Sequence, residues 1–206
     1  MKKKSVSEQI ESCGVIPVIR ASSSEEARFA AEAVRSGGIP IVEITMTVPG
    51  ALQVISGLAK TMPQLVLGAG PVLNKKMSRQ CADAGMVATA KKFKLVVIAG
   101  ALTPTEVMAA WDAGADFVKV FPCCNLGGPA YVKALHGPFP QVPLIPTGGV
   151  TIETAADYIR AGAAALGVGS ELILKDALKA RKSEAISDLA RRFVELVKEV
   201  RKQLTT

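Results

Sequence analysis

Lys119 lies in the middle of a short apolar run, DFVKVFP, at residues 116–122. A run of this length that stops at a proline is typical of a buried strand. Buried lysines are rare, because removing an ammonium group from water costs several kcal/mol. Such a lysine pairs with a carboxylate or stays partly neutral for nucleophilic chemistry. The alternative is a lysine near a strand end whose head group reaches solvent.

Strand parity indicates which polar side chains accompany this lysine. Successive side chains of a strand point to opposite faces, so within residues 39–47 Glu43 shares a face with Thr45 and Thr47. Arg20 takes the equivalent face of residues 14–20. The opposite faces are apolar and suit contact with covering helices. We therefore expect Arg20, Glu43, Thr45, Thr47 and Lys119 to project toward one centre. An ion pair that only satisfies itself is the alternative, but such pairs stabilise little.

Two glycine-containing loops offer a site for an anion. Thr147, Gly148 and Gly149 follow one apolar run, and the sequence GVGS at residues 167–170 closes the next. Glycines let backbone N–H groups approach an anion closely, and the hydroxyls of Thr147 and Ser170 add donors. A single Gly-Gly pair usually marks only a turn. Two such loops after the last strands of a barrel match a common phosphate site.

A regular alternation of strands and helices must position these groups. We expect strands at residues 14–20, 39–47, 65–70, 96–101, 116–122, 144–147 and 165–168. Helices are expected at residues 1–13, 22–36, 50–61, 74–85, 86–93, 103–114, 129–135, 151–161 and 183–203. Strand–helix repeats predict a right-handed parallel sheet. The fold class is therefore α/β, a (β/α)8 TIM barrel with its active site at the carboxyl ends of the strands.

The expected barrel lacks one strand. The pattern supplies seven strands where closure needs eight, and the fourth is missing between Gly85 and Met86, where one helix runs directly into another. Either the barrel is open here or a segment is absent from the chain. The length predicts one domain, residues 1–206, with an N-terminal helix over 1–13 and a C-terminal helix over 183–206.

Composition excludes several other classes of protein. The net charge of +7 comes from basic residues at the two ends of the chain and not from a stripe carrying aromatic residues, which disfavours nucleic-acid binding. The four cysteines have neither metal-site spacing nor a disulfide pattern, and a single histidine disfavours a zinc centre or a Ser-His-Asp site. Residues 5–12 are polar and no apolar run is long enough to span a membrane. A cytoplasmic protein with reduced thiols is expected.

Four motifs together resemble the 2-keto-3-deoxy-6-phosphogluconate (KDPG) aldolases, which share a family with the 4-hydroxy-2-oxoglutarate (KHG) aldolases. They are VEITMTVP at 42–49, GAGPVL at 68–73, DFVKVFP at 116–122 and PTGGV at 146–150. The resemblance implies a homotrimeric barrel and a class I aldolase that needs no metal or cofactor. It implies cleavage of the phosphorylated sugar acid to pyruvate and glyceraldehyde 3-phosphate.

The resemblance also implies roles for individual residues. Lys119 matches the family's Schiff-base lysine, and Glu43 matches its general acid/base glutamate. Arg20 matches an active-site arginine. The remaining substrate-binding candidates lie at the strand ends and in the two loops: Thr47, Phe121, Thr147, Gly148, Gly149, Gly169 and Ser170.

The chemistry of these residue types suits that reaction. An imine nitrogen accepts the electrons released when a carbon–carbon bond breaks, which a ketone oxygen does poorly at neutral pH. Its formation needs a neutral amine, whereas a free lysine, with a pKa of about 10.4, is charged at neutral pH. Burial and a nearby cation both favour the neutral amine. Glu43, through a water, would carry protons during carbinolamine formation and take the C4 hydroxyl proton during cleavage.

Departures from the family's pattern leave alternatives open. Thr47 stands where many members have an arginine for the pyruvate carboxylate, and Pro71 replaces a threonine that would contact it. Cys123 and Cys124 replace small residues and are either packing groups or reactive thiols. An aldolase for 4-hydroxy-2-oxoglutarate or for the galactonate epimer is the alternative within the class. A catalytically silent trimeric scaffold and a phosphate-binding isomerase barrel are alternatives outside it.

Overall fold

In a computed structural model, residues 3–73 and 96–205 are described. Helices and strands alternate along both segments, as the sequence pattern predicts. They run in the order α1 (Lys3–Cys13), β1 (Val15–Ile19), α2 (Ser24–Ser36), β2 (Ile41–Thr45), α3 (Ala51–Thr61), β3 (Val66–Gly70), β4 (Ile98–Ala101), α5 (Pro104–Asp112), β5 (Phe117–Val120), the 3₁₀ helix η2 (Cys124–Leu126), α6 (Pro129–His136), β6 (Leu144–Pro146), α7 (Ala155–Arg160), β7 (Leu166–Val168), α8 (Lys175–Lys179) and α9 (Ser183–Leu204).

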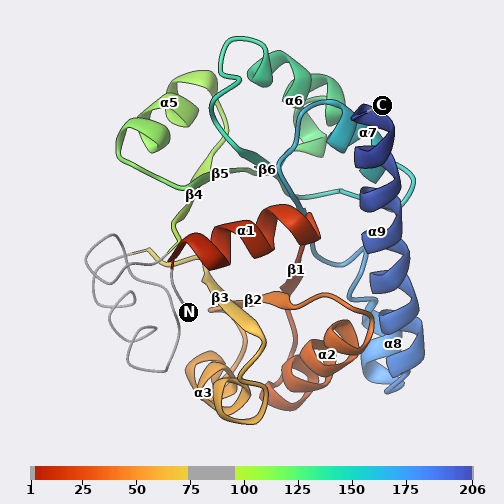
Figure 1. The fold of residues 1–206 in the computed structure, drawn as a ribbon. Helices are drawn as coiled ribbons and strands as arrows, with labels where there is room; N and C mark the ends of the chain where they lie inside the picture. Colours follow the sequence, from red (N-terminus) through yellow and green to blue (C-terminus); the bar gives the residue numbers. More distant parts are fainter. Residues whose placement is uncertain (1–2, 74–95, 206) are drawn as a thin grey trace.

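All strand pairs are parallel and follow each other around a barrel. Four strands pair in the order β3-β2-β1-β7 and three in the order β4-β5-β6. A parallel bridge between Thr147 and Gly167 joins the two sheets at β6 and β7. The strands surround one centre and the helices α2, α3, α5, α6 and α7 lie outside them (Figure 1). The prediction of a (β/α)8-type barrel is confirmed.

The seam of the barrel lies where the sequence lacks a strand. Among the described residues, β3 and β4 are the two end strands of this series and pair with no strand on their outer sides. These two strands are also less buried than β1, all five residues of which are buried. The expected helices at 74–85 and 86–93, and the missing fourth strand after Gly85, lie outside the described residues.

Apolar faces of the helices cover the strands, because each helix must bury its apolar stripe. In α2, alanines and a valine are buried: Ala27, Ala30, Ala31, Ala33 and Val34. The long helix α9 packs against α2, α7 and α8 with a row of buried side chains: Ile186, Ala190, Phe193, Val194, Val197 and Val200. Small alanines allow the close backbone packing that a core with few aromatic residues requires.

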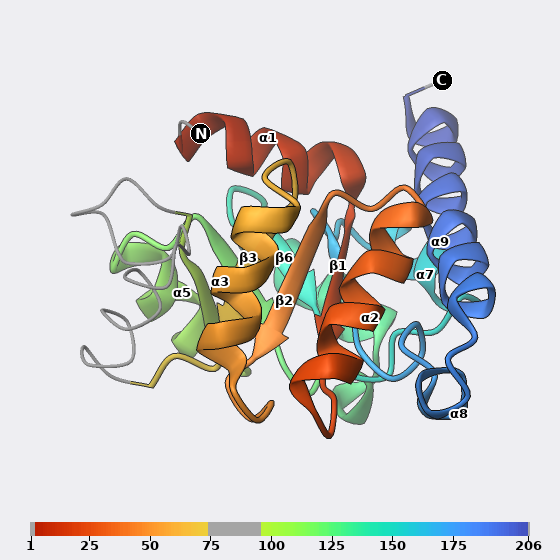
Figure 2. The ribbon, with the colours of Figure 1, turned by 90° about the horizontal axis from the view of Figure 1, so that it is seen from below.

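The end of the barrel at which the strands begin is covered by α1. Figure 2 shows α1 lying across this end, with the arrow of β2 pointing away from it. The Arg201 guanidinium of α9 donates hydrogen bonds to the carbonyl of Glu11 and, at 2.6 Å, to that of Ala164, so it ties α1 to the start of β7. The opposite end, where the strands finish, is therefore the one available to a ligand.

Local hydrogen bonds decide the ends of several elements. Ser23 caps α2, and Thr103 with Glu106 forms the capping box of α5. The predicted start of a helix at Thr151 is wrong, because Thr151 and Thr154 bond each other's backbone N–H groups and the helix begins at Ala155. Helix α8 was not predicted. Within the described residues, no helix combines the length and the apolar composition needed to cross a membrane.

Candidate active site

Lys119 and Glu43 meet inside the barrel. The Lys119 Nζ atom lies 3.1 Å from Oε2 and 3.2 Å from Oε1 of Glu43. Lys119 comes from β5 and Glu43 from β2, which are not neighbours in either sheet, so the ion pair crosses the interior. Strand β5 is buried as predicted, but the Lys119 side chain keeps 23% of its surface exposed and that of Glu43 keeps 15%. The pair is therefore shielded by the strands and still partly accessible to solvent.

The strand register fixes the height of both side chains. Glu43 is the register partner of Val18 on β1 and of Gly68 on β3. Lys119 is the register partner of Gly100 on β4 and of Ile145 on β6. Because two of these four neighbours are glycines, the interior beside the pair holds little side-chain volume. The register partners on both sides thus fix the level of each side chain in the barrel interior.

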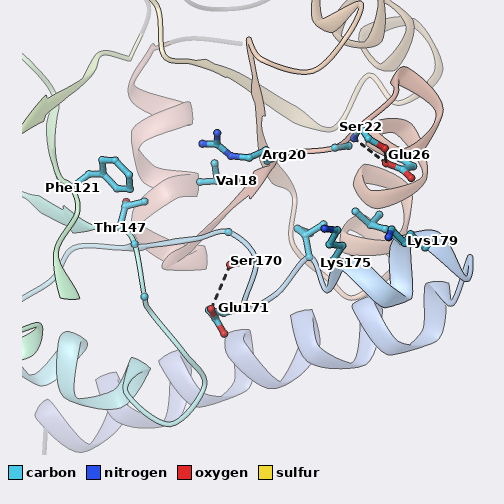
Figure 3. Close-up of a pocket in the computed structure, with 16 residues that line it drawn as sticks. Val18, Arg20, Ser22, Glu26, Phe121, Thr147, Ser170, Glu171, Lys175 and Lys179 are labelled. Carbon is cyan, nitrogen blue, oxygen red and sulfur yellow. Dashed lines mark hydrogen bonds between the residues drawn. The ribbon is translucent and has the colours of Figure 1, made fainter. Parts of the chain in front are cut away.

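A pocket of about 620 Å³ lies at the same end of the barrel, beside the ion pair. It brings together most of the predicted substrate-binding residues and several others (Figure 3). Its lining consists of Val18, Arg20, Ala21, Ser22, Glu26, Phe121, Thr147, Gly148, Gly149, Gly169, Ser170, Glu171, Ile173, Lys175, Leu178 and Lys179. Lys119 and Glu43 are not part of this lining. The pocket lies next to the ion pair, because its lining includes Val18, the register partner of Glu43, and Phe121, two residues after Lys119.

The glycine loops form one wall of the pocket. Gly148 and Gly149 have φ angles of +90° and +71°, a conformation that side-chain-bearing residues rarely adopt. Thr147 is buried, and its hydroxyl bonds the carbonyl of Ile145 at 3.4 Å. The hydroxyl of Ser170 donates to Glu171 Oε1 at 3.4 Å. The predicted Thr147, glycine and Ser170 cluster is therefore assembled, with a carboxylate beside it.

Arg20, Phe121 and Thr47 occupy the rim. Arg20 follows the last residue of β1 and is exposed, and its guanidinium extends toward Phe121 above Val18 (Figure 3). Phe121 is 53% exposed. The predicted second strand ends at Thr45, so Thr47 lies in the following turn, where its hydroxyl is 3.0 Å from that of buried Thr45. Thr47 does not line the pocket.

Sequence reasoning missed the charged residues on the far side of the pocket. Lys175 and Lys179 come from α8, and Glu26 comes from the first turn of α2. Hydrogen bonds from the Ser22 hydroxyl and backbone N–H, at 2.6 and 2.9 Å, lower the pKa of Glu26, so its carboxylate stays charged. The four-residue spacing of the two lysines, directly after the second glycine loop, is the sequence signal that could have revealed them.

Cys123 and Cys124 behave differently from one another. Cys123 is fully buried, and burial raises the pKa of its thiol to about 11. Cys124 is exposed beside Gly149. Cys123 is therefore a packing group, and the exposed thiol is Cys124. In the part of the chain that the structure describes, no group of three or more His, Cys, Asp or Glu side chains is placed to hold a metal ion.

Comparisons with known proteins give the family. The profile of the KDPG and KHG aldolases matches residues 6–189. The KHG/KDPG aldolase of Escherichia coli K12 is 33% identical over 205 positions, covering 93% of this chain and 96% of that protein. Because 205 positions exceed the aligned part of this chain, the alignment contains gaps on this chain's side. The chain is thus shorter than its relative inside the aligned region.

Solved structures agree with the sequence comparison. KDPG aldolase from Legionella pneumophila, with pyruvate captured at low pH as a covalent carbinolamine, has a TM-score of 0.79 at 28% identity and covers 90% of this chain and 96% of its own. A cube-shaped protein cage designed by fusing symmetric oligomeric domains has a TM-score of 0.82 at 29% identity, over 93% of this chain and 74% of its own. This chain belongs to the KDPG and KHG aldolase family.

Proposed function

We propose that this chain, as a single aldolase-type domain, cleaves 2-keto-3-deoxy-6-phosphogluconate to pyruvate and glyceraldehyde 3-phosphate through a Schiff base on Lys119. One observation carries the proposal: the amine of Lys119 lies 3.1 Å from the carboxylate of Glu43, at the end of the barrel where the glycine loops also lie. The relatives support it, since proteins named for this activity match nearly the whole chain.

Glu43 can serve as the proton acceptor that prepares the amine. A Lys119 ammonium transfers a proton to Glu43 across the 3.1 Å contact, and the neutral amine then attacks the C2 ketone of the substrate. Glu43 returns the proton to the carbinolamine oxygen, which leaves as water. The protonated imine that remains can accept an electron pair. In this route Glu43 prepares the amine, and Arg20, which lies exposed at the rim, takes no part in that step.

Glu43 then serves the cleavage step. Its carboxylate takes the proton of the C4 hydroxyl, the C3–C4 bond breaks, and the electron pair enters the imine to give an enamine. Glyceraldehyde 3-phosphate leaves as the aldehyde. Protonation of the enamine at C3 restores an imine, and one water molecule hydrolyses it to pyruvate and free Lys119. One water is released and one is consumed, so the cycle balances.

The phosphate end of the substrate fits the pocket. Gly148, Gly149, Gly169 and Ser170 would supply backbone and hydroxyl donors, as in the anion sites that such loops form. Lys175 and Lys179 would add two positive charges from α8. The carboxylate of Glu171 is the observation that favours a second candidate, cleavage of the unphosphorylated 4-hydroxy-2-oxoglutarate, because it repels a phosphate dianion more strongly than the single carboxylate at the end of that substrate.

We further propose a homotrimer, in line with the resemblance and with the symmetric oligomeric domains of the similar designed cage. The cytoplasmic location expected from the polar residues 5–12 stays a prediction.

Two measurements test the proposed reaction. Borohydride reduction in the presence of pyruvate should add the mass of reduced pyruvate to Lys119, and the Lys119→Met variant should gain none. Pyruvate release should then be followed with the phosphorylated gluconate and galactonate epimers and with 4-hydroxy-2-oxoglutarate. Release by Lys119→Met at the wild-type rate would refute the mechanism. A folded wild-type protein with neither adduct nor release would show a silent scaffold.

A further inference from the structure

We infer that Gly70 is a positioning residue for the reaction. Glycine has no side chain, and the Glu43 carboxylate occupies the space that a side chain at position 70 would fill. The inference rests on the proposed function, in which that carboxylate exchanges protons with Lys119. Gly70 is the last residue of β3 and the register partner of Thr45, two residues beyond Glu43 on β2.

The geometry leaves no room for a side chain at this glycine. A Cβ atom added to Gly70 would lie 2.6 Å from Glu43 Oε1 and 3.0 Å from Glu43 Cδ. Real Cβ atoms essentially never approach another heavy atom within 3.0 Å. The backbone does not require glycine here, since the φ angle of Gly70 is not in the left-handed region. The contact with Glu43 is therefore the reason for glycine at this position.

A side chain at position 70 would displace the Glu43 carboxylate and not the backbone of β2. The atoms that a new methyl group meets are the far end of a flexible glutamate side chain, while the β2 backbone is held by its neighbours. Rotation of the Glu43 side chain relieves the overlap at a small cost in stability. Both oxygens would then leave the positions 3.1 and 3.2 Å from Lys119 Nζ. The fold would persist, but the amine would lose its proton acceptor.

Gly68 provides a matched control on the same strand and the same face. A Cβ atom at Gly68 would lie 3.5 Å from the Val42 carbonyl oxygen and 3.6 and 3.8 Å from Glu43 Cα and Cβ, which are ordinary contact distances. It would touch the stem of Glu43 and not its carboxylate. Both substitutions add one methyl group to β3 beside the same residue, and only the one at Gly70 meets the carboxylate.

The experiment compares Gly70→Ala with Gly68→Ala in the full chain. We expect Gly70→Ala to lower kcat for the phosphorylated substrate by at least about tenfold with KM changed less than about twofold, as for partial loss of a general acid/base. Borohydride trapping with pyruvate should slow in parallel. Gly68→Ala should stay within about twofold of wild type in both measurements. Melting temperatures record any general loss of stability.

A second substitution gives a rescue test. Aspartate is shorter than glutamate by one methylene, so Glu43→Asp leaves space for the methyl group that Gly70→Ala adds. Glu43→Asp should therefore cost less activity in the Gly70→Ala background than in wild type, a coupling expected only for groups in contact. Additive losses, or equal kcat losses in the two glycine variants, would overturn the inference.

A structural readout separates this inference from the proposed function. Crystal structures of both glycine variants would give the distance from Lys119 Nζ to the Glu43 oxygens whether or not the protein is active. A distance unchanged from wild type in Gly70→Ala would refute the positioning role. An inactive wild type with a displaced carboxylate in Gly70→Ala would instead refute the proposed reaction alone.

Discussion

The Lys119–Glu43 pair and the pocket beside it are built in opposite ways. The pair stands on two strands inside the barrel, and less than a quarter of either side chain is exposed. The pocket takes its charges from exposed residues at the rim, from the glycine loops and from the short helix α8. Strand register therefore sets the geometry of the ion pair, while the geometry of the pocket depends on side chains that water surrounds.

This difference separates two kinds of effect. Charges held close in a shielded interior interact strongly, whereas exposed charges are screened by water and salt. Changes at the pair should therefore alter the chemical step, and changes at the pocket should alter substrate affinity. The pocket also carries charges of both signs, namely Arg20, Lys175 and Lys179 against Glu26 and Glu171. Changing one of these exposed charges should therefore have a small effect that depends on ionic strength.

The sharpest test of the comparison replaces one glutamate in the ion pair and one in the pocket by glutamine. Glu43→Gln keeps the shape but removes the proton acceptor, so kcat should fall by roughly 10²–10⁴-fold. Glu26→Gln, the matched control in the pocket, should leave kcat within about twofold and act only on KM. Steady-state pyruvate release measures both. Equal losses of kcat in the two variants would contradict the division between the pair and the pocket.

The glycine loop should show a large effect on binding. Gly149→Ala places a side chain at φ +71°, where it would overlap the Cys124 thiol and lie 2.6 Å from Cys124 Cβ. The loop must shift, and we expect KM for the phosphorylated substrate to rise by about tenfold as anion contacts are lost. Gly127→Ala, at φ +105° with open space around it, is the control for backbone strain alone. Unchanged KM in Gly149→Ala would remove the loop from the phosphate site.

The carboxylate of Glu171 should have a smaller effect of opposite sign. Glu171→Gln removes an exposed negative charge next to Ser170, so KM for the phosphorylated substrate should fall by about two- to fivefold. The gain should shrink at about 0.5 M salt because exposed charges are screened. KM for 4-hydroxy-2-oxoglutarate measured alongside shows whether Glu171 selects between the two substrates. A rise in KM for the phosphorylated substrate would instead make Glu171 a binding residue.

Cys123 should affect stability and not catalysis, because its side chain is buried in the core. Burial raises the pKa of its thiol from about 9.0 to about 11, so the unfolded chain releases this proton first as pH increases. The free energy of unfolding should therefore fall between pH 9 and 11, by at most about 1.4 kcal/mol per pH unit from this group. Urea unfolding of wild type and Cys123→Ala at pH 8 and pH 10 measures it. Identical pH dependence in the two proteins would show that Cys123 does not titrate in this way.

Sequence patterns predicted the barrel because each element carries its own signal. Apolar runs gave all seven strands that the structure describes, and the helices expected at 22–36 and 103–114 are found as α2 and α5. Parity along a strand was enough to place Glu43 and Lys119 on inward faces, since side-chain direction has a fixed period of two. The chemistry of the pair followed from residue type, because an amine beside a carboxylate has few uses inside a barrel.

Only the tertiary structure decided which side chains share a space. The 3.1 Å contact between Glu43 and Lys119 joins strands that are distant in sequence and not adjacent in the sheet, and no local pattern encodes a distance across the barrel. The contributions of Lys175 and Lys179 to the pocket depend on how α8 folds back beside the loops. The need for glycine at position 70 follows from the volume that a carboxylate of another strand already fills. Sequence specifies direction and chemistry locally, whereas proximity and free volume arise only when distant segments pack together.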